Sequence, residues 1–292
     1  MSSPDNSQFE PQPLAGTETP AVPSPLEPFA SSNLTPAATA PTPVENPVWS
    51  GWDVLLVAFL TLVATVIVPL GIGSVAQLLF YPHTTVIEVL QKQSTVVLIA
   101  QFLIDGAWAA LIFLLIEGKY HTRFWPAIRW NWPKVAWTML GLGAVTFVVL
   151  AMLGNLLPMP KETPFDKLFE RPRDAYLLAI IAVTLGPLVE ELFFRGFLYP
   201  VIARRWGAAW GVFLAALPFA LMHLPQYGFS WGIFLVILAV GVVCGMVRAA
   251  TKSVGSSFLV HAGYNGTQMV IAVLYTHGFT RTPKGLLEPW LR

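Results

Sequence analysis

Three charged residues stand close together in one of the most apolar segments of the sequence. Residues 186–197 read GPLVEELFFRGF and include Glu190, Glu191 and Arg195. An ionised side chain in the middle of a bilayer costs roughly 2.5–3.5 kcal/mol on insertion scales, so such residues usually face a bundle interior and serve a function. On a helix, Glu191 and Arg195 share a face, whereas Glu190 is turned by about 100°. We therefore expect a neutralised pair and a spare carboxylate available as a general base.

Two further apolar segments bring imidazole and amide groups. Residues 216–226, ALPFALMHLPQ, contain His223, and residues 257–268, SFLVHAGYNGTQ, contain His261 and Asn265 four positions apart. A single histidine in an apolar helix is more often a satisfied core residue, and a Glu–Arg pair can be purely structural. The joint occurrence of a carboxylate, an imidazole and an imidazole–amide pair on three charge-poor segments favours catalysis instead.

The composition indicates what kind of fold must position these groups. The 292 residues are 55% hydrophobic and 11% charged, whereas soluble domains carry roughly a quarter charged residues. Apolar runs near 20 residues recur, which predicts an all-α, polytopic membrane helix bundle. The net charge of +1 gives no indication of a nucleic-acid partner. The single cysteine, Cys244, is expected to be a small buried hydrophobic residue.

Seven transmembrane helices are expected. They lie at residues 52–81, 95–117, 135–157, 175–206, 208–224, 231–249 and 254–275. The first is long, so Pro69 is expected to kink it or the helix to tilt. Residues 119–134, rich in Trp, Phe and basic residues, predict a connector at the membrane interface. Lys and Arg residues divide evenly between the two sets of loops, so the orientation stays open.

The three polar motifs together resemble a known protease family. EELFFR fits the pattern EExxxR, FALMH fits FxxxH and HAGYN fits HxxxN. Their order and spacing are similar to those of the CPBP family of intramembrane proteases, also called the Abi or CAAX-protease family. The type II CAAX prenyl endopeptidases are members of it. The resemblance covers residues 173–276 and implies an intramembrane endopeptidase.

The resemblance also implies a role for each motif residue. Glu190 resembles the general base that activates water, His223 the residue that positions this water, and His261 with Asn265 the groups that stabilise the oxyanion. Peptide hydrolysis needs such donors, and the loss of one typically costs about 10²–10³ in rate. Supporting positions are implied for Glu191, Arg195 and Phe219.

The sequence divides into four parts on this basis. Residues 1–48, rich in Pro, Ser, Thr and Ala and free of Lys and Arg, predict a disordered tail. Residues 49–172 hold the first three transmembrane helices and their loops. Residues 173–276 form the CPBP-like catalytic core, and residues 277–292 a short C-terminal tail.

For both the cofactor and the function, the sequence leaves alternatives open. Glu190, His223 and His261 are also a possible Zn²⁺ ligand set. The sequence has no HExxH motif, however, and the ligands come from different helices, so a metal-free enzyme without a cofactor is favoured. The expected partners are the lipid bilayer and a membrane-associated protein substrate, prenylated or not, and the expected location is a bacterial cell membrane. The alternatives are a non-catalytic immunity or regulatory factor of the same family and, less favoured without an inverted repeat, a proton relay or transporter.

Overall fold

The computed structural model describes residues 45–280, and this part of the chain is helical without a β-strand. The predicted all-α class is therefore confirmed. The α-helices are α1 (Gly51–Phe80), α2 (Val86–Lys92), α3 (Ser94–Phe113), α4 (Phe124–Ala127), α5 (Ala136–Gly154), α6 (Pro172–Val183), α7 (Leu185–Glu191), α8 (Tyr199–His223), α9 (Trp231–Thr251) and α10 (Val254–Tyr275). Two π-helices, η1 (Leu114–Lys119) and η3 (Leu192–Leu198), and two 3₁₀-helices, η2 (Pro164–Phe169) and η4 (Leu224–Tyr227), connect them.

Five helical segments within residues 45–280 are long and apolar enough to cross a membrane. They are Gly51–Phe80, Ser94–Lys119, Ala136–Gly154, Pro172–Tyr227 and Trp231–Thr251. The fourth contains two of the predicted transmembrane helices, and Gly207, with a positive φ of 84°, breaks the helix between them. Helix α10 forms over the residues predicted for the seventh. It is not among the five, because polar residues such as His261 and Asn265 lower its hydropathy. The number seven stays a prediction.

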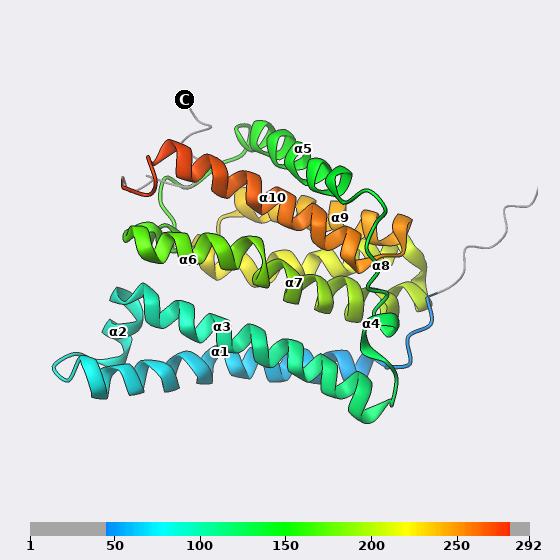
Figure 1. The fold of residues 1–292 in the computed structure, drawn as a ribbon, viewed down its shortest axis with the longest axis horizontal. Coiled ribbons are helices and arrows are strands. Elements are labelled where there is room, and N and C mark those ends of the chain that lie inside the picture. The colour runs from blue at the N-terminus through cyan, green and yellow to red at the C-terminus, as the bar shows by residue number, and fades with distance from the viewer. Residues whose placement is uncertain (1–44, 281–292) are drawn as a thin grey trace, which may run out of the picture. The chain divides into compact units, whose positions relative to one another are not determined.

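The helices that carry the motif residues lie at the centre of the bundle. Figure 1 shows α1 and α3 side by side, with α6 and α7 next to them and α10 and α5 beyond. Helix α7, which ends in Glu190 and Glu191, contacts α3 and also α10. The break between α6 and α7 at Thr184 and the π-helix η3 flank this short helix. Such interruptions of regular helix are frequent at functional sites.

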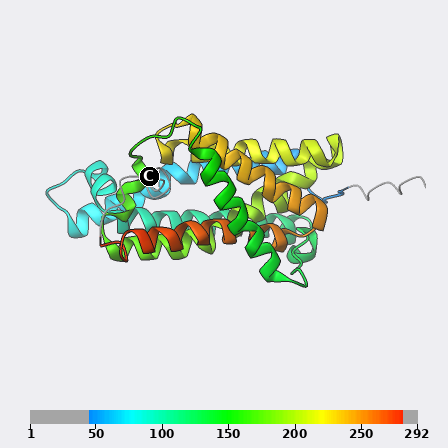
Figure 2. The same cartoon turned by 90° about the horizontal axis from the view of Figure 1, so that it is seen from above.

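Helix α10 is fixed from outside by a close crossing with α5. Figure 2 shows α5 running across α10. Gly143 of α5 and Gly263 of α10 lie at this crossing, where a Cβ on either would collide with the backbone of the other helix, at Val260 or at Leu140. Small residues allow membrane helices to approach this closely. The crossing therefore sets the position of α10 and of the histidine and asparagine that it carries.

A short strap before α1 closes one end of the bundle. Trp49 is buried, donates from Nε1 to the carbonyl oxygen of Phe197 at 2.8 Å and stacks on the Phe197 ring. Glu45 binds the buried Arg248 through both guanidinium Nη atoms, at 3.0 and 3.4 Å, and pairs with Arg129 at 3.2 Å. Residues 45–48 of the predicted tail thus pack on the helices, whereas residues 1–44 lie outside the described part.

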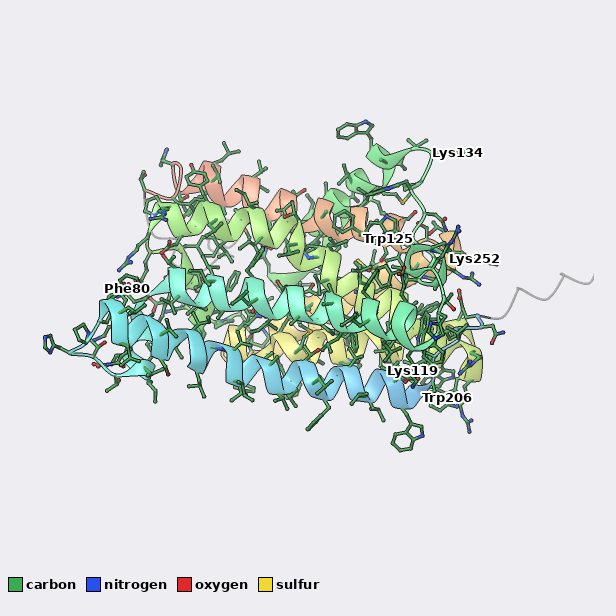
Figure 3. All side chains as sticks on the ribbon, turned by 60° about the horizontal axis from the view of Figure 1, so that its bottom comes forward. Phe80, Lys119, Trp125, Lys134, Trp206 and Lys252 are labelled. Carbon is green, nitrogen blue, oxygen red and sulfur yellow. The ribbon has the colours of Figure 1, made fainter. Side chains whose placement is uncertain are left out.

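This same end carries basic and aromatic side chains. Figure 3 shows Lys119, Lys134, Trp206 and Lys252 there, and Phe80 at the opposite end. The predicted interfacial connector, residues 119–134, contains α4 and a series of Trp rings in edge-to-face contact. Aromatic and basic residues of this kind suit the headgroup region of a bilayer.

The glycine crossing gives a test with a control on the same helix. Gly143→Ala should lower the stability by about 1–3 kcal/mol, because the new methyl group overlaps backbone that cannot move aside. Gly141→Ala places its Cβ in open space and should be neutral or stabilising by up to about 1 kcal/mol. Thermal unfolding midpoints in detergent measure both, and equal midpoints would contradict the close crossing.

Candidate active site

The predicted catalytic residues line one cavity of about 590 Å³. Its walls come from α3, α6, α7, α8, α9 and α10, and its rim includes the loop between α5 and α6. Glu190, His223, His261 and Asn265 all contribute to the wall, together with Phe219. Three helices separated in the sequence thus bring the predicted catalytic groups together.

Behind the cavity wall lies a buried ion pair. Arg195 donates from Nη1 to Glu191 Oε1 at 2.7 Å and from Nη2 to the carbonyl oxygen of Gly241 at 2.7 Å, and both side chains are at most 1% exposed. Ser257 Oγ donates to Glu191 Oε2 at 2.6 Å. The carboxylate and the guanidinium therefore tie α7, η3, α9 and α10 together. The predicted pairing of Glu191 with Arg195 is confirmed.

Glu190 points away from this pair and faces two imidazole rings. Its Oε1 lies 3.7 Å from His223 Nε2, and its Oε2 lies 3.7 Å from His261 Nε2. These separations exceed a direct hydrogen bond, and a bridging water spans distances of this order. The turn of about 100° between adjacent helical residues thus gives the two glutamates different surroundings.

The other ring nitrogen of each histidine is already engaged. His223 Nδ1 lies 2.7 Å from the carbonyl oxygen of Phe219, and His261 Nδ1 lies 3.0 Å from Glu191 Oε1. Both oxygens can only accept, so Nδ1–H is the donor in each ring. This fixes the orientation of both rings and leaves each Nε2 directed at Glu190.

Phe219 supports the site by packing. Its ring centroid lies 4.9 Å from that of His223 and 5.6 Å from that of His261. The Arg195 guanidinium carbon lies 4.7 Å from the same ring, in a cation–π contact. The ring separates the ion pair from the cavity and holds both histidines in place.

Asn265 was predicted to stabilise the oxyanion, but in the structure its side-chain amide binds a backbone carbonyl group. Its Nδ2 donates to the carbonyl oxygen of Ala182 at 2.7 Å. Ala182 lies in the last turn of α6, just before the break at Thr184. The amide therefore links α10 to the start of the segment that carries Glu190, and an oxyanion role for it stays a prediction.

The sequence interpretation missed a contribution from the first three helices. Asp105 and Gln101 of α3 line the same cavity, and Gln101 Nε2 donates to Asp105 Oδ1 at 2.8 Å. The available signal was an aspartate within the apolar segment 95–117. Ser257 was also missed, although its spacing of four from His261 places both on one helix face.

The possible metal ligands group differently from the prediction. Within residues 45–280, ligand atoms of Glu191, Cys244 and His261 lie within 4.8 Å of one another, whereas the zinc alternative considered from the sequence used Glu190, His223 and His261. Both Glu191 oxygens already accept hydrogen bonds, and the Arg195 guanidinium beside them would repel a cation. We interpret this group as a hydrogen-bond network, with Cys244 buried as predicted.

Comparison with known proteins agrees with this geometry. Residues 172–267 match the family model described as type II CAAX prenyl endopeptidase Rce1-like. This segment is an Rce1-like domain. It contains every residue of the three motifs, and the predicted relationship to the CPBP or CAAX-protease family is confirmed. Because the Rce1-like family is a protease family of membranes, the domain and the apolar helices together make the chain an integral membrane protein.

One relative extends beyond the Rce1-like domain. An uncharacterized 24.3 kDa protein of Escherichia coli is 26% identical over 193 residues, which cover 65% of this chain and 78% of that protein. No solved structure matches the chain.

The two adjacent glutamates should differ in their effect on stability. Glu191→Gln leaves the buried Arg195 without a carboxylate and should cost about 3–5 kcal/mol. Glu190→Gln removes a carboxylate whose nearest possible cations are imidazole nitrogens 3.7 Å away, so the loss of stability should be much smaller. Thermal unfolding of the purified variants compares them, and a Glu190→Gln protein as unstable as Glu191→Gln would contradict this division.

Proposed function

We propose that the protein is an intramembrane endopeptidase that hydrolyses a peptide bond of a membrane-associated protein with water activated by Glu190. The observation that carries this proposal is the convergence of two imidazole Nε2 atoms on the two oxygens of Glu190. The adjacent Glu191 is neutralised by Arg195, so Glu190 is the carboxylate left for chemistry. Membership of the domain in a protease family supports the same reaction class.

The proposed reaction begins with a water held between Glu190 and His223. The lone pair of His223 Nε2 accepts one hydrogen bond from this water, because the Nδ1–H of the ring is bound by Phe219. Glu190 accepts the second proton as the water oxygen attacks the carbonyl carbon. Glu190 then returns this proton to the leaving amine as the C–N bond breaks, so no proton is gained or lost.

His261 is proposed to stabilise the oxyanion of the tetrahedral intermediate. As an imidazolium, it keeps Nδ1–H on Glu191 and offers Nε2–H to the oxyanion. The charges of Arg195, Glu191, His261 and Glu190 then sum to zero, which limits the cost of enclosing them in the bundle. Asn265 contributes by holding α6 to α10, and its second amide hydrogen remains available to the intermediate.

The cellular location and the alternative, non-catalytic role can be assessed from the comparison and from the described residues. We propose a bacterial cell membrane as the location, supported by the Escherichia coli relative. The non-catalytic immunity or regulatory role has no specific support among the described residues.

Removal of the proposed base tests the function directly. Glu190→Gln should lower peptide-bond cleavage by at least about 10³-fold, since both the activation of water and the proton transfer depend on this carboxylate. Membrane proteomics of cells that express the wild type or the variant should reveal a protein whose C-terminal peptides or length differ.

A matched control removes a carboxylate elsewhere. Glu88→Gln changes a partly exposed residue of α2 that does not line the cavity, and its cleavage pattern should equal that of the wild type. Unchanged processing in Glu190→Gln cells would remove the proposed mechanism.

Metal content provides a separate test. Glu190 and the Nε2 atoms of His223 and His261 are donors that zinc accepts, and bound zinc would supply Lewis-acid activation of water. We propose the metal-free reaction, so purified active protein should contain well under one zinc per chain and keep its activity with a chelator. Stoichiometric zinc that tracks activity would contradict this.

A further inference from the structure

Asp105 is a buried carboxylate that the proposed mechanism does not use. Asp105 lies in α3, outside the Rce1-like domain, and is only 5% exposed. Gln101 provides a neutral amide hydrogen bond to Oδ1, and within residues 45–280 neither a second hydrogen bond nor an ion pair to Lys, Arg or His is formed. An aspartate within an apolar membrane helix is costly unless something compensates it.

Two other buried acids within residues 45–280 have cationic partners. Glu191 is bound by Arg195, and Asp53 by Lys119. Asp174, which accepts a hydrogen bond from Thr95, lies in the first turn of α6, where the helix dipole favours a negative charge. Asp105 is in the interior of α3 and gains no such help.

Packing holds this carboxylate toward the cavity. Trp108, one helical turn further along α3, contacts the rings of Phe193 and Phe194 in η3, with centroids 4.8 and 5.9 Å apart. These contacts fix the rotation of α3 against the Rce1-like domain. Asp105 therefore lines the same cavity as Glu190.

The charges around the cavity leave a negative excess. Three carboxyl side chains line the cavity, those of Asp105, Glu162 and Glu190, whereas Lys161 is the one Lys or Arg in this lining. At the rim, Lys161 and Glu162 are adjacent in the chain, and their opposite charges cancel. A positively charged group inside the cavity would complete the balance, and hydrogen bonds between charged partners are roughly twice as strong as neutral ones.

We propose that Asp105 is a specificity-determining residue that binds the cationic side chain of a Lys or Arg near the scissile bond of the substrate. This rests on the proposed protease function, and it narrows the substrate class to membrane-associated segments with a basic residue close to the cleaved bond. The specificity then comes from a helix outside the Rce1-like domain.

Binding can be measured without cleavage. The full-length chain with Glu190→Gln, in detergent micelles, is titrated with fluorescent apolar peptides that differ at one position, which holds Lys, norleucine or Glu. The varied residue is placed in turn at each of four central positions. The Lys peptide should bind about tenfold more tightly than the norleucine peptide at one position, and the Glu peptide more weakly than either.

Substitution of Asp105 then tests its role. Asp105→Asn keeps an oxygen for Gln101 and should abolish the preference for Lys over norleucine, whereas Asp105→Lys should shift the preference to Glu. Glu88→Gln, which removes a carboxylate outside the cavity, should leave the preference intact. Unfolding midpoints check that each variant is folded.

The outcomes separate this inference from the protease proposal. Equal affinity for the three peptides, no binding of the Lys peptide, or a Lys preference that survives Asp105→Asn would overturn the role of Asp105. Cleavage of the same peptides by the chain with Glu190 intact is measured in parallel. Cleavage without a charge preference refutes this inference alone, whereas a preference that depends on Asp105 without any cleavage supports it and counts against the protease function.

Discussion

The buried pair of Glu191 and Arg195 is the interaction on which the site depends. Enclosing both charges is tolerable only when every neighbouring donor and acceptor is well placed, and the pair accordingly recruits Gly241, Ser257 and His261 from α9 and α10. Because Glu190 directly precedes Glu191 in the chain, any shift of the pair would move the proposed base as well. The position of the Glu190 carboxylate is therefore set by groups that do not face the cavity.

The features that depend on local spacing could be predicted from the sequence. The low content of charged residues and the length of the apolar runs indicated membrane helices. The spacing of four between Glu191 and Arg195 indicated that these two residues pair and that Glu190 faces elsewhere. The three motifs indicated which side chains meet. What could not be predicted depends on contacts between distant residues, such as the hydrogen bond from Asn265 to Ala182 across 83 positions.

Asp105 is a second example of a feature that the sequence predicts only in part. Its position within an apolar helix was visible in the sequence, but its direction was not, since the contacts of Trp108 with Phe193 and Phe194 determine how α3 is rotated. The Rce1-like domain thus does not contain the whole cavity. Helix α3 completes one wall, and α5 holds α10 through the contact at Gly143, so the cavity and its supporting helices extend well beyond residues 172–267.

The strap of Glu45 and Trp49 has a consequence for biogenesis. These residues leave the ribosome before any of the transmembrane helices, yet Trp49 binds a carbonyl 148 positions later and Glu45 binds an arginine 203 positions later. Contacts over such separations form only after the intervening chain has been inserted. Glu45 and Trp49 are therefore synthesised before the helices but bind among the last, and the contact of Glu45 with Arg248 requires that α9 is already in the bundle.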